Sequence, residues 1–95
     1  MLYIAFVTRR EDISTDTVKT LSQQWWNEGG RPDGLTSRGV YGAIGTAATD
    51  VFIFDCDDHD DLQKMVDHWR SVADLAIHPA TDLAEQWTGF GMDIA

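Results

Sequence analysis

The chain has little cysteine and few basic residues, and each shortage excludes a class of protein. Cys56 is the only cysteine among 95 residues, so no disulfide can form within one chain. Seven Lys and Arg residues stand against 16 Asp and Glu, which gives a net charge of −9 with no basic stripe. We therefore expect neither nucleic acid nor an anionic membrane surface as a partner. No apolar run approaches the length of a membrane span.

The remaining composition is typical of one small globular domain. Hydrophobic residues make up 43% of the chain and include four tryptophans. We expect a single domain over residues 1–95, with 81–95 as a C-terminal tail. A domain of this size buries a modest core and is often supported by disulfides, metals or self-association. The first ten residues lack the charged-then-apolar order of a signal peptide, so we expect a cytoplasmic protein.

The front half of the chain predicts a strand, a helix and a second strand. Residues 2–8 are short, apolar and favourable to a strand. Ser14 is a suitable N-cap, and Gly29 and Gly30 end the helix that follows. Residues 35–45 predict an edge strand that three glycines interrupt. The predicted helix carries one apolar stripe, made of Val18, Leu21, Ser22 and Trp25.

The back half repeats this order. Residues 50–55 form a buried strand, and Asp57 or Asp58 caps the next helix. Residues 75–78 form a fourth strand that Pro79 ends, and the tail holds a helical turn over 83–87. The second helix has a stripe at helical spacing, made of Leu62, Met65, Val66, Trp69, Val72 and Ala73.

The element order predicts an α+β domain of the ferredoxin-like type, β-α-β-β-α-β, with a four-stranded antiparallel sheet and two helices on one face. The strands over 2–8 and 50–55 are apolar on both faces, although two helices cover only one face. We therefore expect a homodimer in which a second copy packs sheet against sheet.

The pattern as a whole resembles the dimeric α/β-barrel superfamily of ferredoxin-like folds. Within it, the run from Phe54 to Asp58, the helix ending near Trp69 and the strand closing at Pro79 resemble a small bacterial family of stand-alone domains of unknown function. The superfamily includes cofactor-free oxygenases, isomerases, polyketide cyclases, haem enzymes and ligand-sensing domains, so the resemblance implies a fold and does not select an activity.

The sequence offers no convincing metal or cofactor site. The aspartates from Asp55 to Asp61 lack the glycine and glutamate positions of a calcium loop, and helix starts attract aspartate for capping alone. His59, His68 and His78 show no ligand spacing for zinc or haem. We expect no cofactor and no metal.

A few side chains remain as candidates for a functional site. His78 and His68 are the candidate catalytic acid or base residues, because histidine titrates near neutral pH. Trp26 falls off the stripe of its helix and is the tryptophan expected to line a cavity or contact a partner. Further candidates for ligand binding are Tyr3, Tyr41 and Arg38.

Two functional hypotheses follow from these candidates. The first is a homodimer with a small apolar pocket between sheet and helices, which binds an aromatic or polyketide-like molecule. If this protein is an enzyme, it fits a cofactor-free isomerase, cyclase or monooxygenase. The second is a non-catalytic module that binds a ligand or a partner protein. No Ser-His-Asp arrangement or nucleotide-binding loop favours hydrolysis or phosphate chemistry.

Overall fold

The computed structural model describes residues 1–43 and 49–94. Within these residues the chain forms four strands, β1 (Leu2–Arg9), β2 (Leu35–Gly42), β3 (Thr49–Cys56) and β4 (Ala73–Pro79). It also forms three helices, α1 (Thr15–Asn27), α2 (His59–Trp69) and α3 (Leu83–Gly89). None of these helices is long and apolar enough to cross a membrane.

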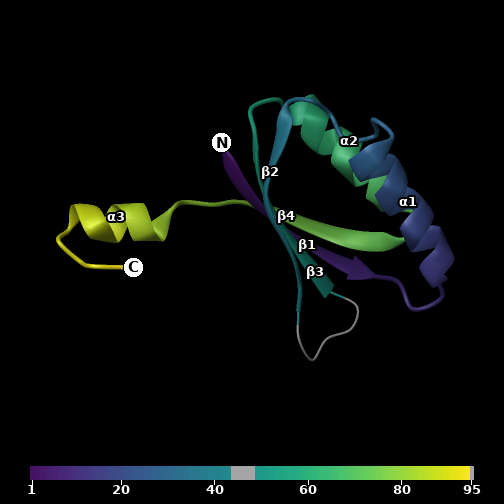
Figure 1. Ribbon diagram of the computed structural model, residues 1–95, viewed down its shortest axis with the longest axis horizontal. Helices are drawn as coiled ribbons and strands as arrows, with labels where there is room; N and C mark the ends of the chain where they lie inside the picture. Colours follow the sequence, from purple (N-terminus) through teal and green to yellow (C-terminus); the bar gives the residue numbers. More distant parts are fainter. Residues whose placement is uncertain (44–48, 95) are drawn as a thin grey trace.

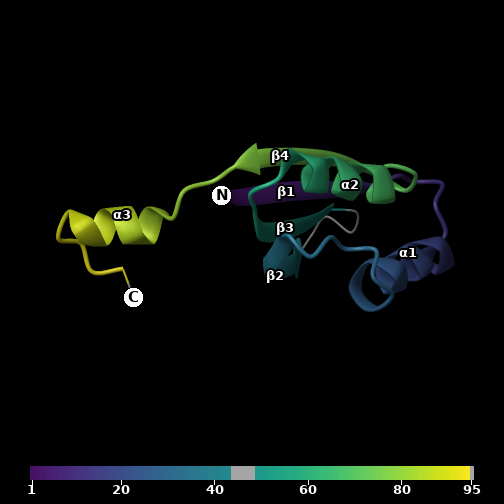
Figure 2. The same ribbon diagram turned by 90° about the horizontal axis from the view of Figure 1, so that it is seen from above.

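The strands form one antiparallel sheet in the order β2-β3-β1-β4. Each of the two central strands is followed by a helix that crosses to an outer strand, which is the ferredoxin-like arrangement. Figures 1 and 2 show α1 and α2 on the same face of the sheet. The predicted fold class is therefore confirmed. We call the face that α1 and α2 leave uncovered the open face.

Strand register decides which side chains enter the core. Tyr3 pairs with Phe54 and Ala5 with Phe52, and all four are buried on the helix side. The rings of Tyr3 and Phe54 stack with centroids 5.8 Å apart. Alternate residues point to the open face, as the period of two requires. Trp25, Met65 and Trp69 complete the core from the helices.

Both helices begin at the caps that the sequence predicts. The Thr17 N–H donates to Ser14 Oγ at 3.2 Å, and the Asp60 N–H donates to Asp58 Oδ1 at 2.9 Å. The helix ends at Trp69, where the family resemblance places its end, but the predicted apolar stripe is wrong at its last two residues, because Val72 and Ala73 lie beyond the helix. These two residues lie in the turn and in β4, and both are buried. The apolar spacing at Val72 and Ala73 therefore reflects burial and not helical structure.

The edge strand β2 is irregular, as its glycines predict. Its register against β3 shifts between Ser37 and Gly39. A Cβ added to Gly39 would lie 2.6 Å from the ring of Tyr41, so a larger residue there would require this exposed ring to move. The predicted end of the strand at Gly45 falls outside the described residues.

The C-terminal segment lies apart from the rest of the molecule. The predicted helical turn is confirmed as α3, which the Asp82 side chain caps and in which no residue is buried. Figures 1 and 2 show α3 beyond the end of the sheet, joined to β4 by an extended segment. We call residues 82–94 the C-terminal arm. The arm contributes to an elongated outline of 48 × 32 × 20 Å.

Candidate functional site

A cavity of about 140 Å³ lies between the sheet and helices α1 and α2. Its walls are mainly apolar. The principal apolar residues on the walls are Val7 and Phe52 from the sheet, Val18 and Trp26 from α1, and Trp69 from α2. The cavity therefore has the apolar lining that small-molecule sites generally show.

Aromatic rings in edge-on contact frame this space. The ring of Phe52 meets the ring of Trp26 at 6.4 Å and that of Trp69 at 6.1 Å, both in T-shaped arrangements. Smaller side chains line the rest of the cavity, among them Val72 and Ala73. Since rigid rings cannot collapse onto small neighbours, the packing leaves a space.

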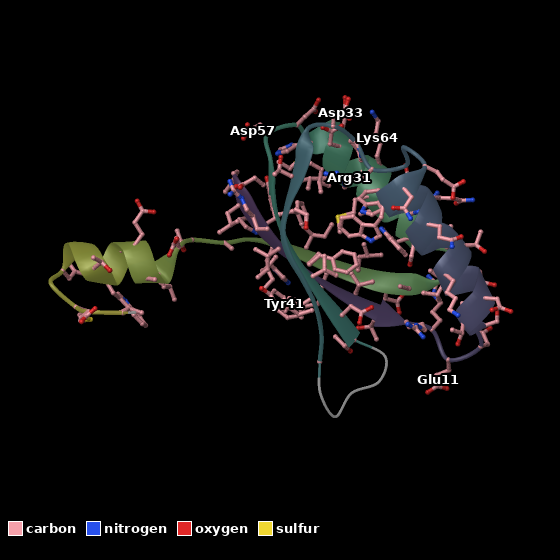
Figure 3. All side chains as sticks on the ribbon, viewed as in Figure 1. Glu11, Arg31, Asp33, Tyr41, Asp57 and Lys64 are labelled. Carbon is pink, nitrogen blue, oxygen red and sulfur yellow. The ribbon has the colours of Figure 1, made fainter. Side chains whose placement is uncertain are left out.

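Trp26 forms an accessible part of the wall. Its side chain is 38% exposed, whereas its neighbour Trp25 is 1% exposed. The guanidinium of Arg31 lies 5.7 Å from the centre of the Trp26 ring, and Arg31 Nη1 donates to the carbonyl of Leu35 at 2.5 Å. Figure 3 shows Arg31 close to the helices. The cation–π contact orients a ring that solvent could otherwise displace.

Three polar residues contribute to the lining: Ser22, Arg9 and Asp50. Ser22 Oγ donates to the carbonyl of Val18 at 2.8 Å, so it is occupied within α1. Arg9 ends β1, Asp50 is the second residue of β3, and both are half-buried. The cavity thus combines an apolar interior with one cationic and one anionic side chain.

The two candidate histidines lie outside this lining. Nε2 of His68 is 2.8 Å from the carbonyl oxygen of Leu21, and because a carbonyl can only accept, Nε2 donates. The His68 ring lies between Trp25 and Trp69, at 5.1 and 5.0 Å. His78 is on the open face, where its ring is 6.3 Å from that of Phe6. The structure does not bring the two histidines together.

The remaining candidates are divided between the core and the open face. Tyr3 is buried in the core, 7% exposed. Arg38 forms an ion pair with Asp55 on the open face. Tyr41 is 59% exposed, and Figure 3 shows it on the side of the sheet away from α1 and α2. Of the candidates drawn from the sequence, Trp26 is the one that lines the cavity.

Sequence reasoning missed Arg9 and Asp50. The sequence did contain a signal for them. Each lies at the end of a strand and points to the same face as a buried residue of that strand. Arg9 shares a face with Val7, and Asp50 shares a face with Phe52. A charged residue on the core-facing side of a strand end is a candidate for the rim of a pocket.

The aspartates at the start of α2 act within the chain. The protonated amine of Met1 donates to Asp57 Oδ1 at 2.7 Å. This hydrogen bond lowers the pKa of Asp57 and raises the pKa of the amine. Across residues 1–43 and 49–94, no group of three or more His, Cys, Asp or Glu side chains could hold a metal ion.

The fold and the cavity define a ferredoxin-like α+β domain with a small apolar site between its sheet and its helices. More particularly, the chain belongs to DUF3303, a family described as a domain of unknown function, whose model matches residues 1–93. The predicted resemblance to a family of unknown function is thereby confirmed, while the dimeric α/β-barrel superfamily stays a prediction.

The chain is also similar to a solved structure. The crystal structure of protein Atu4242 from Agrobacterium tumefaciens is 17% identical, with a TM-score of 0.49. The alignment covers 85% of this chain and 94% of that one. No curated protein matches the chain.

Proposed function

We propose that the protein binds a small apolar molecule, of the size of one aromatic ring, in the cavity between the sheet and α1 and α2. The observation that carries the proposal is the cavity itself, with its volume of about 140 Å³ and its aromatic walls. An engineered apolar cavity of about 150 Å³ in another protein binds benzene. The volume therefore favours a one-ring ligand over a fused polyketide.

Binding without turnover is the form of the proposal that the geometry favours. An isomerase, cyclase or cofactor-free monooxygenase needs an acid or base within reach of the substrate. His68 is engaged with Leu21, and His78 is on the opposite face of the sheet. Asp50 is the lining side chain that could accept a proton, so a catalytic role would have to use it.

A matched pair of variants on α1 tests the binding proposal. Ser22 and Thr20 both donate to the carbonyl four residues earlier, but Ser22 lines the cavity and Thr20 is exposed. Toluene, added to the ¹⁵N-labelled protein, should shift resonances of residues around the cavity. Ser22→Leu should abolish these shifts because the larger side chain fills the space, and Thr20→Leu should retain them. Absence of saturable shifts in the parent protein would refute the proposal.

We also propose that two copies associate through the open face and the C-terminal arm. Ile4, Phe6 and Ile53 lie on this face, and Phe6 is 40% exposed. Contiguous apolar surface on a small domain commonly marks an interaction site. The arm is apolar as well, with exposed side chains at Leu83, Trp87, Phe90, Met92 and Ile94.

A second copy is the occupant that fits both surfaces at once. The arm extends away from the body of its own chain (Figure 1), so its apolar side chains can cover the open face of a partner. A twofold arrangement makes the exchange reciprocal and covers both arms. The arm also carries acidic residues and no Lys or Arg, but Arg38 on the open face already pairs with Asp55 of its own chain, so the proposal is supported by the apolar side chains of the two surfaces.

A further inference from the structure

Arg9 and Asp50, the two charged residues that line the cavity, are diagonal neighbours in the sheet but do not form an ion pair. Asp50 lies directly opposite Val7, and Arg9 is two residues further along β1 on the same face. Such diagonal neighbours are about 7–8 Å apart. Among the described residues no ion pair joins Arg9 to Asp50. A cation and an anion therefore border the same apolar space without forming an ion pair.

We infer that the ligand is a zwitterion, an α-amino acid with an apolar side chain of about one ring. Its carboxylate pairs with Arg9, its ammonium group pairs with Asp50, and its side chain enters the cavity. The two charged groups of an α-amino acid are attached to one carbon. Charge-assisted hydrogen bonds of about 2.8 Å on either side can therefore bridge the two residues. This inference rests on the proposed function of the cavity.

Ligands with one charge or none fit the pair Arg9 and Asp50 less well. A ligand with a carboxylate alone would pair with Arg9, but Asp50 and a chain of net charge −9 would repel it. A ligand with an ammonium group alone would pair with Asp50, but Arg9 would repel it. A neutral ring would leave both charges without a partner while displacing part of their hydration. The zwitterion satisfies both.

Four probes with the same ring separate these possibilities. They are L-phenylalanine, 3-phenylpropionate, 2-phenylethylamine and toluene, which carry both charges, the negative one, the positive one and neither. We expect L-phenylalanine to bind about tenfold more tightly than each singly charged probe, as a charge-assisted hydrogen bond predicts. Saturable chemical-shift changes of the ¹⁵N-labelled protein give the dissociation constants.

Variants assign each charge to its residue. Arg9→Gln should remove the preference for L-phenylalanine over 2-phenylethylamine, because the carboxylate of L-phenylalanine would then have no cationic partner and both probes would keep the same ammonium contact with Asp50. Asp50→Asn should remove the preference over 3-phenylpropionate. Arg10→Gln is the matched control, since Arg10 carries the same charge but bonds to Asp74 and does not line the cavity. It should leave both preferences unchanged.

The outcomes separate this inference from the proposal on which it rests. If toluene binds and L-phenylalanine binds no more tightly than the singly charged probes, the inference is overturned and the apolar site remains. If none of the four probes binds, both fall. Equal loss of preference in Arg10→Gln and Arg9→Gln would also overturn the inference, because it would show a general effect of charge.

Discussion

His68 is held in place by the atoms around it. It donates to the Leu21 carbonyl from α1, and its ring packs between Trp25 and Trp69. These contacts link α2 to α1 in the core of the domain. The described contacts of the ring are this hydrogen bond and its packing against the two tryptophans, so we expect a structural role for His68.

Replacing His68 should change stability and leave binding intact. His68→Leu should lower the free energy of unfolding by roughly 1 kcal/mol, the usual net contribution of one hydrogen bond. The affinity for toluene should remain the same. Urea unfolding followed by tryptophan fluorescence gives the first quantity, and His59→Leu at an exposed position is the control. A large loss of toluene affinity at unchanged stability would contradict this assignment.

The ion pair between the Met1 amine and Asp57 should give a pH-dependent contribution to stability. The pKa of Asp57 is lowered in the folded chain, so its contribution is present above the ordinary value of 3.8 and is lost as pH falls through the lowered value. The pKa of the Met1 amine is raised, so its contribution is present below 8.0 and is lost as pH rises through the raised value.

The pair should therefore stabilise the fold chiefly between about pH 4 and pH 8. Asp57→Asn tests this, because it keeps a polar side chain and removes the charge. The difference in unfolding free energy between the parent and the variant should be greatest in that range and should shrink toward pH 2 and pH 10. A difference in unfolding free energy that stays constant from pH 2 to pH 10 would show that the ion pair does not stabilise the fold.

At the scale of elements, much of the fold could be predicted from the sequence. Periodicity located all four strands, and capping chemistry located Ser14 and narrowed the second cap to Asp57 or Asp58, of which Asp58 is the cap in the structure. The apolar stripe of α2 was extended too far because Val72 and Ala73, which lie in the turn after the helix and in β4, are buried and happen to continue a helical spacing.

The candidate site was far less predictable. A cavity depends on which side chains meet across strands and helices, and sequence spacing does not contain that information. Trp26 could be singled out because it lies off the buried stripe of α1. Strand parity could have marked Arg9 and Asp50 one by one, but only the register between β1 and β3 makes them neighbours. Tyr41 and Arg38 had plausible chemistry, but strand parity places them on the open face.

At the scale of the whole molecule, the open face and the arm should set the oligomeric state. Phe6→Glu should shift the protein toward monomer, because it places a charge in the apolar surface that a second copy would bury. Phe6 is 40% exposed in the single chain, so the domain itself should stay folded. Gln23→Glu, which adds the same charge to the exposed side of α1, should leave the assembly unchanged.

Sedimentation equilibrium measures this assembly directly. Since each copy has a net charge of −9, added salt should strengthen a dimer by screening the repulsion between its subunits. A parent protein that is monomeric at micromolar concentration in both low and high salt would refute association through the open face.

The cavity between the sheet and α1 and α2 is the centre of this account, and a crystal soaked with bromobenzene tests it most directly. Anomalous scattering from bromine marks the position of the ring without assumptions about its contacts. We predict a bromine peak in the cavity, within contact distance of Trp26 and Phe52, that is absent from crystals of Ser22→Leu. Bromine found at the open face or the arm, with an empty cavity in the parent protein, would contradict the account.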